Sequence, residues 1–393
     1  MKILLLHNRY KISGGEDSVF NSEVKMLRDN GNIVDYIVWD NSEIITFRQK
    51  VKTAFFSLYN PIARAVIERK IKEFNPDMIH IHNFFPQISP SVFFVADKFN
   101  TPVVMTLHNF RLICSNAILY TKGSICEKCV NKVFPFEGIK NRCYRNSYFQ
   151  TFNVTLMTSF HKLIGTWREK TGRFIALTDF QKEMIVHSSL NLKLENLAVK
   201  PNFVSDPGVG LKKRENFFIF VGRLSVEKGI NVLLDSFRYH SYRLKIIGDG
   251  VMKELVLKES KSNPNIEFLG YKEKDLLLDQ IKRSRALIFP SECYEGFPIV
   301  ITEALATGTP VISSNIGSQA EIVKNGYNGI HFKVSDPEDL AEKIKLFDNK
   351  EIKKMYINAR KTYLEKYTPE INYKILKEIY KKTIDGKKKN NIN

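Results

Sequence analysis

Short apolar runs alternate with amphipathic stretches along most of the chain. The runs have the length of β-strands and are apolar almost throughout, which is typical of strands buried on both faces of a parallel sheet. Amphipathic segments of helical length lie between them. The predicted strands cover 2–6, 33–39, 78–82, 102–108, 173–178, 217–222, 243–248, 286–290 and 310–314. The predicted helices cover 15–29, 61–74, 91–99, 229–238, 252–261, 274–284, 300–307 and 337–347.

The strand–helix pattern restarts near residue 216, after the sequence PNFVSDPGVGLKKREN (201–216), whose Pro, Gly and charged residues indicate a linker. A chain of 393 residues is also too long for one ordinary core. We therefore predict an α/β protein with two doubly wound, Rossmann-like parallel-sheet domains, residues 1–205 and 210–370, which face each other across a cleft. Residues 371–393 are expected to form a C-terminal helix and a basic tail.

The formal net charge of +18 favours an anionic partner, such as nucleic acid, an anionic membrane face or a phosphorylated substrate. The sequence contains no recognition module for nucleic acid. The sequence contains no stretch of about 18 uncharged apolar residues, so no transmembrane helix is predicted. The first apolar run ends at His7 without a cleavage pattern, so we interpret it as a strand and expect a cytoplasmic protein.

Two glutamates stand out in the sequence PSECYEGFPIVITEALATGTPVI (290–312). Glu295 lies in the loop after a predicted strand, and Glu303 lies about two turns along the helix that follows. Ligands bind beyond the carboxyl ends of parallel strands, so both carboxylates belong where a ligand is expected. Glu295 can accept hydrogen bonds from sugar hydroxyls, and Glu303 can bind a vicinal diol such as a ribose. The alternative for Glu303 is an ordinary surface position, which its apolar neighbours disfavour.

Basic and glycine-rich loops follow other predicted strands. Arg223 and Lys228 follow the strand at 217–222 and are placed on the loop and the first turn of the next helix. Two cations beside a helix N-terminus can bind a diphosphate, although a solvated basic turn is an equally good interpretation of these two residues alone. Gly14 and Gly15, after the first strand, allow the backbone to approach a ligand closely.

Three motifs together carry a resemblance to a known family. GRLSVEKG (222–229), IIGDG (246–250) and EGFPIVITEALATGTPVI (295–312) resemble the retaining glycosyltransferases of family four, which have the GT-B fold. The resemblance extends through TLHN (106–109), ALTDFQKE (176–183) and PNF (201–203) to YTPE (367–370), which looks like the start of the family's C-terminal helix.

The resemblance implies roles for individual residues. Arg223 and Lys228 correspond to the pair that binds the donor's diphosphate, and Glu303 corresponds to the ribose ligand. Glu295 and His108 correspond to the residues that face the donor sugar. Backbone groups that hold the donor come from Gly15, Gly296, Phe297 and Ile299. The family more often has Asp at the position of Asn109, so no catalytic role is assigned to Asn109.

The implied activity is transfer of a hexose from a UDP- or GDP-sugar to a saccharide or lipid-linked acceptor, with retention of configuration and no metal. Such an enzyme would build a cell-surface polysaccharide or glycolipid at the inner face of the membrane. Two alternatives stay open: a UDP-sugar epimerase of GT-B fold, and a catalytically silent scaffold that binds nucleotide sugars. The resemblance makes nucleic acid an improbable partner.

Four of the five cysteines fall within one segment, which we interpret as an insertion at 110–145. They are Cys114, Cys126, Cys129 and Cys143. A CxxC pair flanked by one cysteine on each side can bind zinc with four thiolates, and the spacing favours a structural zinc site over four free thiols.

The segment 139–173 combines basic and aromatic residues. Apolar side chains from Phe152 to Trp167 fall on one helical face, which could lie in an anionic membrane interface. We favour the alternative that this face packs against its own domain, while still expecting some peripheral membrane contact elsewhere.

Overall fold

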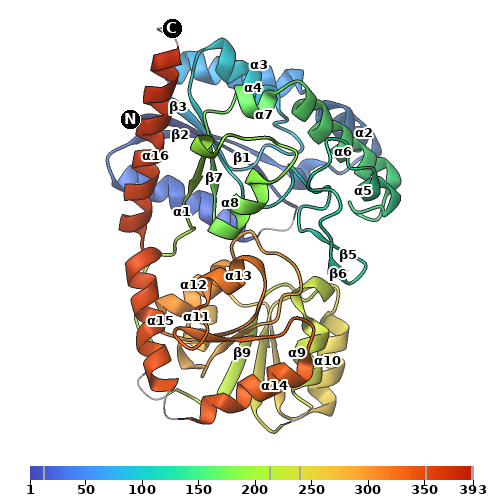
Figure 1. Ribbon diagram of the computed structural model, residues 1–393, viewed down its shortest axis with the longest axis vertical. Coiled ribbons are helices and arrows are strands. Elements are labelled where there is room, and N and C mark those ends of the chain that lie inside the picture. The colour runs from blue at the N-terminus through green and yellow to red at the C-terminus, as the bar shows by residue number, and fades with distance from the viewer. Residues whose placement is uncertain (12–13, 212–213, 239, 350–351, 391–393) are drawn as a thin grey trace. The chain divides into compact units, whose positions relative to one another are not determined.

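The computed structural model describes residues 1–11, 14–211, 214–238, 240–349 and 352–390 (Figure 1). The chain forms two compact units. The first comprises Met1–Thr121, Cys126–Pro201 and Asn372–Asn393, and the second comprises Lys122–Ile125 and Asn202–Ile371. Lys212 and Lys213 of the predicted linker lie outside the described residues. Among the described helices, none combines the length and apolar composition needed to cross a bilayer.

The first unit is built on a parallel sheet with strand order β2-β1-β3-β4-β7-β8. Its strands are β1 (Lys2–Arg9), β2 (Ile33–Asp40), β3 (Met78–Ile81), β4 (Val103–Thr106), β7 (Arg173–Ala176) and β8 (Leu197–Val199). Its helices are α1 (Gly15–Asp29), α2 (Phe47–Phe56), α3 (Pro61–Phe74), α4 (Ser91–Lys98), α5 (Phe136–Lys140), α6 (Tyr148–Leu163), α7 (Thr166–Glu169) and α8 (Asp179–Val186). The C-terminal helix α16 (Pro369–Asn390), red in Figure 1, continues through most of the predicted basic tail.

The second unit repeats the architecture with strand order β11-β10-β9-β12-β13-β14. Its strands are β9 (Phe217–Val221), β10 (Arg243–Ile247), β11 (Ile266–Gly270), β12 (Leu287–Phe289), β13 (Val311–Ser314) and β14 (Gly329–Phe332). Its helices are α9 (Ile230–Ser236), α10 (Lys253–Ser262), α11 (Lys274–Arg283), α12 (Ile299–Ala306), α13 (Gly317–Ile322), α14 (Pro337–Lys345) and α15 (Ile352–Lys366). A separate two-stranded sheet joins β5 (Tyr120–Thr121) and β6 (Ser124–Ile125).

Both sheets are parallel throughout, as the uniformly apolar strand runs predict. The central strands are fully buried: Ile3 to Leu6 of β1 and Phe218 and Ile219 of β9 have no exposed surface. In β1, Leu4 pairs with Asp35 of β2 on one side and with Ile79 of β3 on the other. Every predicted strand is present, whereas β8, β11 and β14 were not predicted.

Helix ends follow local sequence signals. The Asn60 side chain caps α3 by accepting hydrogen bonds from the backbone N–H groups of Ile62 and Ala63, and Pro61 occupies the first turn. Asp336 caps α14 in the same way, again followed by a proline. Gly308, with φ of +71°, follows the end of α12 and lets the chain turn into β13.

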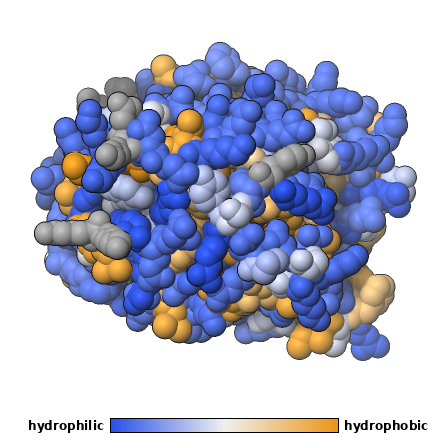
Figure 2. Space-filling view, turned by 90° about the horizontal axis from the view of Figure 1, so that it is seen from below, coloured by the Kyte–Doolittle hydropathy of each residue, from blue (hydrophilic) through white to orange (hydrophobic). Residues whose placement is uncertain are grey.

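Hydrophilic residues cover most of the face shown in Figure 2, and hydrophobic residues form separate patches there. This distribution agrees with a charged fraction of 26%. A continuous apolar surface that could contact a membrane must therefore be sought on other parts of the molecule.

Candidate active site

The loops that carry the predicted donor-binding residues meet where the second sheet changes direction. From β9 the chain proceeds through β10 and β11 to one edge, and then returns to β12 and continues to the other edge. Ligands of open α/β sheets bind at this switch point, beyond the carboxyl ends of the strands. Arg223 and Lys228 follow β9 and Glu295 follows β12, so all three belong to the two loops that flank the switch point.

Backbone contacts hold these loops together. The N–H of Glu292 donates to the carbonyl of Glu227 at 2.9 Å, which joins the loop after β12 to the loop after β9. The N–H of Leu224 donates to the carbonyl of Asp249 at 2.9 Å, which joins the loop after β9 to the loop after β10. The GRLSVEKG and IIGDG motifs are therefore neighbours.

Lys228 and Glu295 form an ion pair at the centre of this arrangement. The ammonium of Lys228 lies 2.5 Å from Oε1 of Glu295, and the hydroxyl of Ser291 donates to the same oxygen at 2.6 Å. Burial raises the pKa of Glu295, but the charge of Lys228 and these hydrogen bonds outweigh it and hold the pKa below its usual value. Burial lowers the pKa of Lys228, and the Glu295 carboxylate more than offsets this. Both groups are therefore charged at neutral pH.

Arg223 and Lys228 differ in their position and in the exposure of their side chains. Lys228 ends a 3₁₀ turn (Val226–Lys228) ahead of α9, so it does not lie on the first turn of that helix as predicted. The reason is Gly229, whose φ of +70° separates the two elements. The side chain of Arg223 is 59% exposed and contacts Oε1 of Glu227 at 3.0 Å, which leaves its guanidinium accessible to an anion.

The predicted ribose ligand, Glu303, lies on α12 and is only 5% exposed. Its carboxylate pairs with the ammonium of Lys274, the first residue of α11. Lys274 was missed by the sequence analysis, because no motif links two positions 29 residues apart. Burial of Glu303 contradicts the alternative that it is an ordinary surface residue.

The remaining predicted backbone groups lie at the start of α12. Gly296 and Phe297 precede the helix, and Ile299 is its first residue. The first N–H groups of a helix have no carbonyl one turn back, so they are available to an anion. Phe297 is 9% exposed, and its ring lies 5.8 Å from that of Tyr367, which fixes the entry of the chain into the helix.

In the first unit, His108 follows β4 and contacts His82, which follows β3. Nε2 of His108 lies 3.0 Å from Nδ1 of His82. Burial lowers the pKa of His108 well below its usual value, so its ring is neutral. Both histidines line a pocket with Tyr10, Asn109 and Arg111. The side chain of Asn109 accepts a hydrogen bond from the N–H of Arg111 at 2.9 Å and donates to the Tyr10 hydroxyl at 3.3 Å, a structural role for this residue.

Gly15 begins α1, and the adjacent loop is held by Asp17. The N–H of Gly14 donates to Oδ2 of Asp17 at 3.0 Å, while Oδ1 of Asp17 lies 2.7 Å from Nε2 of the buried His7. The glycine pair therefore has a fixed backbone conformation beside a charged side chain.

Glu16 is a further candidate that the sequence analysis missed. Burial and the neighbouring Asp17 raise the pKa of Glu16 to about 8, despite the opposing effect of Arg111. Its Oε1 atom is buried without a hydrogen-bond partner. A carboxyl group that is protonated near neutral pH can donate a hydrogen bond, but no sequence motif marks this position.

None of the four clustered cysteines forms a disulfide bond. Burial raises the pKa of Cys129 to about 12, and the other three thiols of the cluster act in the same direction. Among the described residues, a group of three ligand atoms within 4.8 Å of one another occurs at Glu23, His80 and His82, and not at the cysteines. The zinc site therefore stays a prediction, and binding of zinc would require the sulfurs to approach one another.

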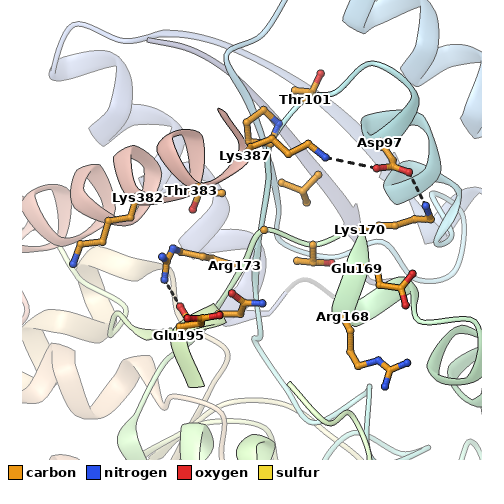
Figure 3. Close-up of a pocket in the computed structure, with 16 residues that line it drawn as sticks. Asp97, Thr101, Arg168, Glu169, Lys170, Arg173, Glu195, Lys382, Thr383 and Lys387 are labelled. Carbon is orange, nitrogen blue, oxygen red and sulfur yellow. Dashed lines mark hydrogen bonds and ion pairs between the residues drawn. The ribbon is translucent and has the colours of Figure 1, made fainter. Parts of the chain in front are cut away.

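A pocket at the opposite, amino-terminal end of the first sheet is an alternative site (Figure 3). In this view Lys170 and Lys387 both point at Asp97, with distances of 2.6 and 3.6 Å. Arg173 donates to the carbonyl of Glu195. Lys170, Lys387 and Arg173 thus have partners within the protein, and active sites of parallel sheets lie at the other end of the strands.

Comparisons with known proteins show which family the second unit resembles. Residues 205–362, which include the two carboxylates and the basic loop, match the family model described as "Glycosyl transferases group 1". An uncharacterized glycosyltransferase of Methanocaldococcus jannaschii is 26% identical over 395 residues, with 98% of this chain and 99% of the relative covered. The capsular polysaccharide biosynthesis glycosyltransferase CapM of Staphylococcus aureus is 28% identical, with 52% of this chain and 60% of the relative covered.

The fold is also shared with solved structures. The Anabaena protein HepE in complex with UDP has a TM-score of 0.67 and 16% identity, with 96% of this chain and 99% of that chain covered. This likeness confirms the predicted fold class, two doubly wound parallel-sheet domains of the GT-B type.

Proposed function

We propose, from the premise that residues 205–362 form a domain of the glycosyl transferases group 1 family, that the protein is a retaining hexosyltransferase that uses a nucleoside diphosphate sugar. One observation supports this most directly: Arg223, Lys228 and Glu295 belong to the loops at the switch point of the second sheet. Cations there can bind the diphosphate, and an ionised carboxylate beside them can bind sugar hydroxyls.

The proposed reaction breaks the bond between C1 of the sugar and the phosphate oxygen and forms a bond between C1 and the acceptor oxygen. The proton of the acceptor hydroxyl passes to the departing phosphate, on the same face of the sugar. Negative charge grows on the leaving diphosphate, and Lys228 and Arg223 would stabilise it electrostatically. Two protein cations can serve this purpose, so we propose that no metal is required.

Substrate binding assigns the remaining predicted roles. Glu303 would bind the ribose hydroxyls of the donor, in which case it would exchange its contact with Lys274 for contacts with the nucleotide. The backbone N–H groups at the start of α12 would bind the phosphates. His108 and Gly15 of the first unit would contact the sugar and its phosphates. Relatives such as CapM support a role in polysaccharide biosynthesis. The acceptor we propose is a saccharide or a lipid-linked saccharide.

Thermal stability with UDP, GDP, ADP, CDP and dTDP, with and without EDTA, tests this proposal. Ligands that bind the native state raise the melting temperature, by an amount that depends on affinity. We expect one diphosphate to raise it with or without EDTA, and Glu303→Ala to abolish the rise. Glu365→Ala, an exposed position on α15, serves as the control and should retain the rise. If no nucleotide raises the melting temperature, the proposed donor site is refuted. The catalytically silent scaffold gains no support from that result, because it too must bind a nucleotide.

We also propose that the protein contacts an anionic membrane surface through α6. Sequence analysis favoured a helix whose apolar face packs against its own domain, and this is wrong for five residues: Phe152, Leu156, Phe160, Leu163 and Ile164 are 45%, 38%, 41%, 71% and 42% exposed. These residues define the α6 stripe. Only Trp167, beyond the helix, is buried as expected.

The α6 helix presents its apolar stripe outward because its polar face makes specific hydrogen bonds. Asn153 donates to the carbonyl of Ala54 at 2.8 Å, and the ring of His161 lies 2.9 Å from the carbonyl of Leu58. Thr155 shares a hydrogen bond of 2.9 Å with Ser115. Rotation of the helix to bury the stripe would leave these buried polar groups without partners.

Charge near the α6 stripe supports an anionic membrane as its partner. The guanidinium of Arg142 lies 5.2 Å from the ring of Tyr148 at the start of α6, and Arg145 is exposed nearby. Insertion of a Phe or Leu side chain contributes about 1.5–3 kcal/mol when it is fully buried. Aromatic and basic residues on one helix are typical of interfacial binding.

Vesicle sedimentation measures this contact. We expect binding to vesicles that contain phosphatidylglycerol, weaker binding to pure phosphatidylcholine, and loss of binding in Phe152→Ser/Phe160→Ser. Ile357→Ser removes a side chain that is 69% exposed on α15 and is the matched control. Equal binding of both variants to anionic vesicles would refute a role for α6.

A further inference from the structure

A buried hydrogen-bonded chain in the first unit ends at His108. It begins at Lys200, which follows β8 and whose ammonium lies 2.9 Å from Oε2 of Glu23 on α1. Oε1 of Glu23 lies 3.2 Å from Nε2 of His82, and Nδ1 of His82 lies 3.0 Å from Nε2 of His108. Glu23 and Lys200 have no exposed surface, and His82 is 2% exposed.

The protonation of the first members of the chain is fixed by charge. Burial raises the pKa of Glu23, but Lys200 and the two adjacent histidines outweigh it, and the pKa lies well below its usual value. The side chain is thus a carboxylate, which can only accept hydrogen bonds. Nε2 of His82 must therefore carry a proton and donate a hydrogen bond to Glu23.

The same argument continues to His108. Burial lowers the pKa of His82 to about 4, against the effect of Glu23, so the ring is neutral and its Nδ1 has no proton. That bare nitrogen can only accept, so Nε2 of His108 must be the donor across the 3.0 Å contact. Since the ring of His108 is neutral as well, its Nδ1 is left bare. Among the described residues, no side chain or backbone group hydrogen-bonds to this nitrogen.

We propose that Glu23 and His82 are positioning residues, which hold His108 in the Nε2–H tautomer so that it offers the substrate a hydrogen-bond acceptor and no donor. The partner chemistry is then a hydroxyl group of the donor sugar, which would donate to Nδ1 of His108. This inference rests on the proposed function, because it takes His108 to face the sugar. It adds two residues, on α1 and after β3, that touch no substrate.

The chain is better explained as a hydrogen-bond relay than as a metal site. Glu23, His80 and His82 bring three ligand atoms together, but the ammonium of Lys200 already lies against the carboxylate. Nδ1 of His80 lies 2.7 Å from the Tyr380 hydroxyl, and its Nε2 lies 2.8 Å from the hydroxyl of Thr106. A divalent cation would have to displace these partners and lie next to a buried positive charge.

Nitrogen NMR of protein labelled with ¹⁵N-histidine tests the relay directly, because protonated and bare ring nitrogens have well-separated shifts. His108→Gln identifies the His108 signals by their loss. In the unmodified protein near neutral pH we expect Nε2 of His108 to be protonated and Nδ1 to be bare. The opposite tautomer, or a doubly protonated ring, overturns the inference.

Variants connect the tautomer to activity. Glu23→Gln/Lys200→Met removes both buried charges together, and the amide no longer dictates which nitrogen of His82 is protonated. We expect a mixture of His108 tautomers and a fall in kcat of about 10- to 100-fold, as for other positioning residues. His161→Gln alters a buried histidine outside the chain and should leave the His108 tautomer unchanged. An unaltered tautomer in the double variant overturns the inference.

Nucleotide binding separates this inference from the proposed function. Arg223, Lys228 and Glu303 belong to the second unit, so the double variant should retain the nucleotide-dependent rise in melting temperature. If the unmodified protein shows no such rise, the proposed function fails, while the NMR measurement still decides the tautomer. If the rise is present but kcat of the double variant is unchanged, only the positioning role is refuted.

Discussion

At the scale of single residues, the Lys228–Glu295 pair shows what a local motif can predict. Both residues were identified from the sequence, because glycines and prolines around them fix their loops at strand ends. The 2.5 Å contact between them was not predictable, since it joins side chains 67 positions apart. The contact keeps two half-buried charges compensated until substrate arrives.

Lys228→Met should lower kcat/KM by about 10²- to 10³-fold, the usual effect of removing one group that stabilises developing negative charge. Initial rates with the donor identified by thermal shift measure this effect. Lys361→Met removes an exposed lysine on α15 and should change the rate little. A rate for Lys228→Met close to that of the control would contradict the assigned role.

Other residues of the site could not be predicted because tertiary packing alone brings them in. Lys274 meets the predicted Glu303 across two helices, and Glu23 meets His82 across a helix and a strand. Lys274, Glu23 and His82, each viewed in its own segment, carry no motif that marks them. Charge pairing of this kind requires the folded structure.

At the scale of secondary-structure elements, the central strands were predictable and three edge strands were not. β8, β11 and β14 each lie at a sheet edge. An edge strand has one hydrogen-bonded neighbour and is less completely buried, so its apolar signal is weaker. The orientation of α6 was mispredicted for a related reason: its buried face carries threonines and a histidine, which a hydrophobicity pattern assigns to the surface.

The turn between β9 and α9 depends on a glycine that no other residue can replace without strain. A Cβ atom on Gly229 would lie 1.9 Å from the carbonyl oxygen of Pro290, which is backbone and cannot move aside. Gly326 has a similar φ, +75° against +70°, but a Cβ there would meet nothing within 4 Å. Substitution at Gly326 therefore introduces backbone strain alone, whereas substitution at Gly229 introduces both strain and steric overlap.

Gly326→Ala should destabilise the protein by about 1–3 kcal/mol, the cost of an L-residue in the left-handed region. Gly229→Ala should cost clearly more, since steric overlap adds to the same strain, and it should also weaken nucleotide binding by displacing Lys228. Thermal unfolding of both variants compares them. Equal losses of stability would show that the loop after β12 moves to accommodate the extra atom.

The cysteine segment is an element whose stability can be measured independently. If zinc binds, purified protein contains about one equivalent of zinc by elemental analysis, and EDTA lowers the melting temperature. Cys129→Ser should remove both the zinc and the effect of EDTA, whereas Cys293→Ser, outside the segment, should retain them. Metal-free protein with an EDTA-independent melting temperature would establish four free thiols.

At the scale of the whole molecule, buried ionisable groups make stability depend on pH. The pKa of His82 is lowered to about 4 in the native state, whereas the unfolded chain takes up the proton near 6.5. Acid therefore favours the unfolded state: the stability contributed by neutral His82 is complete above pH 6.5 and is lost as pH falls toward 4. The loss is about 3 kcal/mol for this side chain. Glu23 acts in the same direction at lower pH.

Denaturant unfolding at several pH values tests this dependence. We expect the unmodified protein to be more stable than His82→Gln at pH 7.5, and the difference between them to narrow by pH 5, because the variant lacks the titrating ring. His187→Gln, at an exposed position, should follow the unmodified protein at every pH. A constant difference between the unmodified protein and His82→Gln would refute the assigned pKa.

The return of α16 to the first unit has a consequence for how the protein is made. The side chain of Asn372 accepts a hydrogen bond from Lys200 at 3.0 Å, and Tyr380 contacts His80. During synthesis, the ribosome has completed the entire second unit before these two residues exist. Until then, Lys200 and His80 of the nascent first unit lack these two hydrogen-bond partners. Translation rate and chaperone contact during that interval should influence the yield of folded protein.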